Sequence, residues 1–217
     1  MKQIISVVLM ITIAVSASAQ KVRLNAYGAS VFDESFQYTL DVYNYYKGRI
    51  DGGFQSGAGL EYFVEPKGSL ELTYLRHDTH GPTTYRAGAY TYTKTADLNF
   101  SLNYLMLGVN GYLKARKGQL EFYGGLAQGI VIIDINNPSN GSASTTTKFA
   151  WSAKGGSNFW ITNRVGLKFQ SQFIMAVLPK GGNLSASADV FNTFSTIMQY
   201  NIGGGLTFKL GEIGNSR

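Results

Sequence analysis

The chain of 217 residues contains no cysteine, which excludes a disulfide scaffold and any cysteine-based metal or redox site. Charged residues make up only 15 % of it, while Trp, Tyr and Phe contribute 2, 14 and 13 residues, and this composition excludes a disordered chain. The 26 glycines follow no Gly-X-Y period, which excludes collagen. No stretch reaches about 18 consecutive apolar residues, so the sequence offers no transmembrane helix.

The first 19 residues have the pattern of a cleaved signal peptide. Lys2 provides a positive charge, Ile4 to Val15 form an apolar stretch, and Ala17-Ser18-Ala19 is a small-residue cleavage site. The apolar stretch is too short to span a bilayer comfortably, which disfavours an uncleaved anchor. Residues 1–19 are therefore predicted to be a signal peptide, and residues 20–217 a single mature domain with a net charge of about +5.

Apolar and polar residues alternate along most of the mature chain, as they do in half-buried strands. In the last segment Met198, Tyr200 and Ile202 share one parity, and Gln199 and Asn201 share the other. The alternation predicts eight strands, near 21–32, 52–65, 69–78, 96–115, 119–133, 148–161, 165–178 and 196–210.

The predicted connections alternate between short and long. Three short polar turns occur at Pro66–Gly68, Arg116–Gly118 and Thr162–Arg164. Four longer segments rich in Gly, Ser, Thr and Tyr are predicted as loops, at 33–51, 79–95, 134–147 and 179–195. Short periplasmic turns and longer extracellular loops are typical of outer-membrane barrels.

Two segments depart from simple alternation. In 96–115 the apolar parity changes near Tyr104–Leu105, and a β-bulge there is the expected explanation. In 119–133 the polar Gln128 shares its parity with Leu126 and Ile130, so the register of this strand stays open.

The alternation fits either a soluble lipocalin-like barrel, apolar inside, or a membrane barrel, apolar outside. The polar parity is rich in Gly, Ser, Asn and Gln and poor in charge, whereas a surface in water carries many charges. Aromatic residues gather near strand ends, as interfacial girdles require, at Tyr62, Phe63, Tyr112, Phe122, Tyr123, Phe159, Trp160 and Phe208. These features favour an all-β fold, an eight-stranded antiparallel up-and-down transmembrane β-barrel.

The chain resembles the family of small eight-stranded outer-membrane β-barrels, such as OmpX and the transmembrane domain of OmpA. The signal peptide, the turn and loop alternation and the last strand carry the resemblance. Asn201, Gly203, Leu206 and Phe208 match the family's assembly signal, although the tail after Leu210 departs from members that end on the aromatic residue. The resemblance implies insertion into the cell outer membrane by the barrel-assembly machinery, and contact with outer-membrane lipid and lipopolysaccharide.

The inward parity of such a barrel predicts a polar network in the lumen. Its expected members are Arg23, Glu61, Glu71, Glu121, Lys154, Lys168, Gln170, Gln172, Gln199 and Asn201. Eight strands enclose a space that side chains can fill, so a network that plugs the barrel is expected. A narrow channel for small or hydrophobic solutes is the alternative.

The predicted loops are unusually rich in tyrosine, mixed with cations such as Lys47 and Arg86. The tyrosines in the first two loops are Tyr38, Tyr43, Tyr45, Tyr46, Tyr85, Tyr90 and Tyr92. Tyrosine among small and basic residues suits a recognition surface or an outer-leaflet interface, and strands extended above the bilayer are the alternative. A structural or interaction role, with an extracellular ligand of unknown chemistry, is therefore expected. No basic helix or clustered basic patch suggests nucleic-acid binding.

His77, Asp78 and His80 are the residues that a metal site or a hydrolase would use. Some eight-stranded barrels of the resembling family are lipid-modifying enzymes of the outer leaflet, but their His-x-Ser spacing is absent here. Extended strands also direct His77 and Asp78 to opposite faces. The expectation is a protein that is not an enzyme and holds no metal or cofactor.

The cleavage site predicts that the mature protein begins at Gln20. N-terminal sequencing of protein extracted from membranes should return Gln-Lys-Val. Recovery of Met1 from the same material would contradict the assignment of residues 1–19 as a signal peptide.

Overall fold

A computed structural model describes residues 21–41, 44–86, 94–115, 119–138, 141–177 and 196–211. The predicted signal peptide, the predicted turn Arg116–Gly118, the segment 179–195 and Tyr43, Tyr90 and Tyr92 lie outside the described residues. The strands are β1 Val22–Val31, β2 Glu34–Asp41, β3 Asn44–Ile50, β4 Gly53–Glu65, β5 Gly68–Arg86, β6 Lys94–Lys114, β7 Leu120–Asn137, β8 Ser142–Trp160, β9 Val165–Val177 and β10 Thr196–Lys209. Within the described ranges, no helix is long and apolar enough to cross a membrane.

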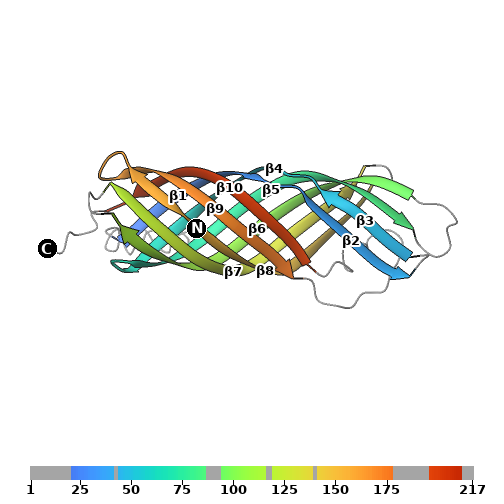
Figure 1. Cartoon of the computed structure of the whole chain (residues 1–217), viewed down its shortest axis with the longest axis horizontal. Helices are drawn as coiled ribbons and strands as arrows, with labels where there is room; N and C mark the ends of the chain where they lie inside the picture. Colours follow the sequence, from blue (N-terminus) through green and yellow to red (C-terminus); the bar gives the residue numbers. More distant parts are fainter. Residues whose placement is uncertain are drawn as a thin grey trace, which may run out of the picture.

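The strands form one closed antiparallel cylinder (Figure 1). β1 pairs with β10 and β4, and the chain continues β5, β6, β7, β8, β9 back to β10. The row of paired residues that starts at Phe208 goes once round the barrel and returns to β10 at Met198, ten residues earlier in the sequence. An eight-stranded barrel has an interior that side chains fill.

The ten strands form a wall of eight, because β2 and β3 are continuations of β1 and β4 in an interrupted first hairpin. β2 continues β1 after Phe32–Asp33, and β3 leads into β4 after Asp51–Gly52. The β2–β3 pairing then replaces the β1–β4 pairing, and β3 joins the far end of β5. The predicted eight-stranded transmembrane barrel is therefore confirmed.

Three of the four predicted long loops are wrong in extent. The segments 33–51, 79–95 and 134–147 consist mostly of strand, in the hairpins β2–β3, β5–β6 and β7–β8. Their Thr, Tyr and Ile residues are good strand formers, and pairing satisfies backbone groups that a long loop would leave to water. These hairpins form the extended end of the barrel (right in Figure 1).

The outer face carries an apolar belt with a sharp limit on the side of the extended end, which we call its upper limit. On β5 the outward residues Leu70, Leu72 and Tyr74 are about half exposed, and the next outward residues are Arg76 and Asp78. On β6 the outward residues change from Leu105, Leu107 and Val109 to Asn103 and Ser101 at the same register. Such a belt is the surface that meets hydrocarbon in a membrane barrel.

Beyond the upper limit of the belt, the inner face of the barrel is apolar and the outer face is polar. Leu98, Phe100 and Leu102 of β6 point inward and are 7 %, 2 % and 1 % exposed, packed in a core with Ile133 and Ile174. The expected bulge at Tyr104–Leu105 is wrong, because β6 pairs without interruption with both neighbours through these residues. The residue parity stays constant, and the apolar side changes because the outer environment changes from lipid to water.

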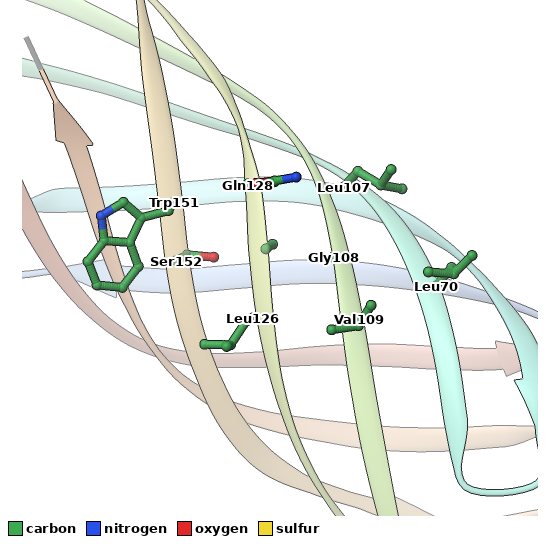
Figure 2. Close-up of a pocket in the computed structure, with 9 residues that line it drawn as sticks. Leu70, Leu107, Gly108, Val109, Leu126, Gln128, Trp151 and Ser152 are labelled. Atoms are coloured by element: carbon green, nitrogen blue, oxygen red, sulfur yellow. The ribbon is translucent and has the colours of Figure 1, made fainter. Parts of the chain in front are cut away.

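Gln128 lies on the outer face of β7 with Leu126 and Ile130, in the register that pairs it with Leu107 and Trp151. Figure 2 shows its amide beside a shallow hollow of about 430 Å³ on the outer wall. The hollow is lined mainly by apolar side chains, those of Leu70, Leu107, Val109, Leu126, Ala127 and Trp151.

A carboxylate joins the first hairpin to the last strand above the belt. Regular pairing of β1 with β10 ends at Val31 and Asn201, and the Phe32 amide then donates to the Tyr200 carbonyl at 3.0 Å. Further up, the Met198 amide donates to the Glu34 carboxylate at 2.6 Å. Burial raises the pKa of Glu34 from its ordinary value of 4.5 to about 7, although the Met198 hydrogen bond opposes the rise.

Glu34 predicts a pH-dependent stability of this junction. The folded protein holds a proton on Glu34 that the unfolded chain has already released, so the associated stability is complete below about pH 4.5 and is lost as pH rises through about 7. From about pH 5 to about pH 8, the thermal midpoint should fall more in the wild type than in Glu34→Gln. Glu65→Gln, which removes an exposed acid at the turn end, is the control. A thermal midpoint that falls equally with pH in the wild type and in Glu34→Gln contradicts the assignment.

Candidate functional site

A buried ion pair crosses the barrel near its turn end. The Arg23 guanidinium of β1 donates to both oxygens of the Glu121 carboxylate of β7, at 2.8 and 3.2 Å. Both side chains are 1 % exposed. Because β1 and β7 are four strands apart in a wall of eight, this bidentate pair spans the interior from one side to the other.

Aromatic rings enclose the Arg23 guanidinium. Its central carbon lies 4.1 Å from the ring centre of Phe63 and 5.0 Å from those of Tyr112 and Trp160. Cation–π attraction of this kind strengthens when water is excluded. The expected girdle is thus wrong for Phe63, Tyr112, Tyr123 and Trp160, which point inward, whereas Tyr62, Phe122 and Phe159 are exposed on the outer face.

Glu71 is the centre of a second cluster above this pair. Its carboxylate accepts hydrogen bonds from the Lys154 ammonium and the Tyr27 hydroxyl, and from Asn25 and Asn110 at 2.9 Å. Space for the carboxylate comes from Gly59, where any side chain would overlap the Glu71 oxygen.

Glu61 completes the charged layer together with Lys168. The Glu61 carboxylate accepts from the hydroxyls of Ser69 and Tyr112 and from the Asn110 amide at 3.0 Å. The Lys168 ammonium lies 3.9 Å from the Tyr123 ring centre and 3.5 Å from the Asn158 carbonyl oxygen. Arg23, Lys154 and Lys168 therefore face Glu61, Glu71 and Glu121, and buried charges are tolerated when they are balanced in this way.

An amide layer lies between the charged layer and the apolar core. Gln199 accepts from the Tyr104 hydroxyl at 2.7 Å, a contact that again joins opposite strands, and its amide lies 3.3 Å from His77 Nδ1. Gln170, Gln172 and Asn201 belong to this layer, since Gln170 accepts from Tyr123 and donates to Gln172, and Asn201 donates to Gln55. All ten side chains predicted for the lumen thus point inward, and hydrogen bonds or charge pairs engage each of them.

The interior also contains polar residues that were not among those predicted for the lumen. They include Asn25, Tyr27, Gln55, Ser69, His77, Asn110, Tyr112, Tyr123 and Asn158. The alternation in the sequence indicates their parity. For the tyrosines, however, only the register with the neighbouring strands shows whether that parity faces the lumen or the lipid. Between the layers lies a cavity of only about 10 Å³, bordered by Tyr27, Gln55 and Leu75.

The histidine candidates do not come together. His77 is fully buried in the lumen, whereas Asp78 and His80 are exposed on the outer face. Asp78 pairs with Arg76 at 2.8 Å, and His80 lies 2.7 Å from Asn99. In the described part of the chain, no group of three His, Asp or Glu side chains is placed to hold a metal ion.

The tyrosines at the extended end are register partners rather than residues of separate loops. Tyr38 of β2 pairs with Tyr46 of β3, which pairs with Tyr85 of β5, and Tyr45 pairs with Arg86.

The residues of the predicted assembly signal lie on both faces of β10. Leu206 is exposed on the outer face and Phe208 shares its parity, while Asn201 and Gly203 have the inward parity.

The fold is similar to that of solved outer-membrane barrels. Neisserial surface protein A has a TM-score of 0.54 at 14 % sequence identity, with 87 % of this chain and 96 % of that chain covered. The outer membrane protein OprG of Pseudomonas aeruginosa has a TM-score of 0.55 at 12 % identity, with 88 % and 96 % covered. No protein-family model matches the chain, and no curated protein matches its sequence. The likeness confirms the predicted fold, that of small outer-membrane β-barrels.

Removal of one partner from the crossing ion pair should destabilise the barrel strongly. Arg23→Met leaves Glu121 as an uncompensated buried charge, which costs about 3–5 kcal/mol. The double variant Arg23→Met/Glu121→Leu should recover part of that loss, because neither charge then remains. The measurement is the free energy of unfolding in urea, in detergent or lipid, and a double variant no more stable than Arg23→Met would contradict a compensated pair.

Proposed function

We propose that the chain is an outer-membrane barrel with a closed lumen, and that its extended end performs a structural or binding role at the cell surface. The observation that carries the proposal is the set of side-chain bonds across the interior. Arg23–Glu121 and Tyr104–Gln199 join opposite strands at two levels, and the cavity between the layers is about 10 Å³. A lumen filled by bonded side chains in this way supports a scaffold role more than a channel.

The extended end brings together tyrosines and a cation beyond the apolar belt. Three hairpins continue beyond the apolar belt, and Tyr38, Tyr45, Tyr46 and Tyr85 lie there in adjacent register rows with Arg86. Tyrosine supplies large, rigid and amphipathic contact area at a low entropic cost. Lipopolysaccharide or an extracellular ligand are the partners that such a surface suits, and no enzymatic role is proposed.

A channel for hydrophobic solutes is the second candidate, favoured by one observation. The upper interior is lined by Leu98, Phe100, Leu102, Ile133 and Ile174, an environment that suits an apolar molecule. Any such molecule would still meet the amide and charged layers below, so passage requires the crossing bonds to open.

The closed lumen predicts that the purified wild-type protein produces no ion-conductance steps in a planar lipid bilayer. A variant without both crossing bonds, Arg23→Ser/Glu121→Ser/Tyr104→Ala, should conduct, because its lumen loses three large side chains. Heat-modifiable gel migration confirms that each protein inserted is folded. Reproducible steps from the folded wild type would overturn the closed lumen and favour the channel.

The proposed surface role predicts that the first hairpin is accessible and dispensable for folding. Replacement of 37–48 by a short Gly/Ser turn removes pairs of β3 with β2 and β5 at the extended end. The pairing of β1 with β4 closes the wall below them, so the heat-modifiable barrel should persist. Trypsin added to whole cells should cut after Lys47 or Arg49 in the wild type and leave Lys67 intact. Cleavage at Lys67 with the hairpin untouched would invert the proposed orientation.

A further inference from the structure

The charges of the described residues separate by position along the barrel. In the charged layer of the interior, Arg23, Lys154 and Lys168 face Glu61, Glu71 and Glu121, and Lys148 is a further buried cation nearer the extended end. At the extended end, cations and anions nearly balance, since Arg49 and Arg76 pair with Asp51 and Asp78. At the turn end, only Glu65 accompanies a set of cations, which are Lys21, Lys67, Lys114, Arg164 and Lys209. The net positive charge of the described residues therefore resides largely at the turn end.

Four of these cations, Lys21, Lys67, Lys114 and Arg164, are exposed, and we call them the basic collar. No ion pair within the described ranges engages any of them. Lys209 differs, because its ammonium lies 3.6 Å from the Trp160 ring centre inside the mouth of the barrel.

The collar lies where the apolar belt ends. Lys67 comes three residues after Val64, and Arg164 comes three residues after Ile161. Lys114 directly follows Leu113 at the end of β6, with the inward parity of Tyr112, and is exposed at the mouth of the barrel. Leu113, Val64 and Ile161 are 68 %, 50 % and 59 % exposed on the outer face. Cations next to the last lipid-facing side chains lie at the height of lipid headgroups.

The collar also goes round the whole barrel. Its members stand before β1, between β4 and β5, at the end of β6 and between β8 and β9, which divides the ring of strands into sectors on all sides (the turn end is on the left in Figure 1). A protein partner would approach from one side and favour a clustered patch. A lipid annulus surrounds the barrel and meets every sector.

We propose that the basic collar binds the phosphate headgroups of anionic phospholipids in the leaflet that meets the turn end. Anionic headgroups attract each nearby Lys or Arg, and the attraction weakens with salt. The inference rests on the membrane location proposed above, and it adds a preferred lipid class and a preferred leaflet.

The test compares retention of phosphatidylglycerol and phosphatidylcholine with identical acyl chains. Folded protein in detergent receives an equal mixture, and native mass spectrometry counts the lipids of each kind that remain bound. The collar variant is Lys67→Gln/Lys114→Gln/Arg164→Gln. The matched control, Arg49→Gln/Arg76→Gln/Lys94→Gln, removes the same charge from the extended end.

Wild type and control should both retain phosphatidylglycerol in preference, and the collar variant should lose that preference by about tenfold or more. High salt should reduce it in the wild type. No preference in the wild type, or equal loss in both variants, overturns the collar. So does a collar that captures soluble peptidoglycan fragments without any lipid preference. Failure of the folded protein to insert into vesicles would instead refute the membrane location, so the two failures are distinguishable.

Discussion

Closure of the sheet is the constraint on which the structure depends. A membrane offers no hydrogen bonds to the backbone, so every strand must have two neighbours, and a wall of eight strands leaves room inside for side chains only. Charges placed there must be balanced. Arg23 and Glu121 meet this requirement across the full width of the barrel, and Lys154 and Glu71 meet it higher up. A residue such as Gly59 follows from the same requirement, since it makes space for a carboxylate.

A single strand of this barrel also passes through two environments, lipid and water. Along β6 the outward residues from Leu105 to Val109 form the belt, while Leu98 to Leu102 belong to an inward core outside the belt. The lower barrel is thus polar inside and apolar outside, and the upper barrel has the arrangement of a soluble protein. An apolar upper core gives the hairpins β5–β6 and β7–β8 buried side chains to pack on where they extend beyond the belt.

The sequence predicts the class of fold and the direction of most side chains, because alternation is a local property. It places Glu71, Lys154 and Lys168 inside, but which of them meet depends on register around a closed ring, and Arg23 and Glu121 are 98 residues apart. The bulge expected at Tyr104 failed because alternation alone does not reveal where the surrounding solvent changes. The girdle expected at Tyr112 and Trp160 failed for a related reason, since an aromatic residue near a strand end suits either face. The basic collar likewise appears only when the turns are brought to one end.

The exchange of apolar faces at the edge of the belt is tested most directly by solid-state NMR of the protein in lipid bilayers. Methyl groups of Leu102, Ile133 and Ile174 should show contacts with one another and none with lipid acyl chains. Methyl groups of Leu105, Leu107 and Leu126 should receive magnetisation from acyl chains instead. Lipid contacts at Leu102, or their absence at Leu107, would contradict a barrel whose apolar side reverses along a continuous strand.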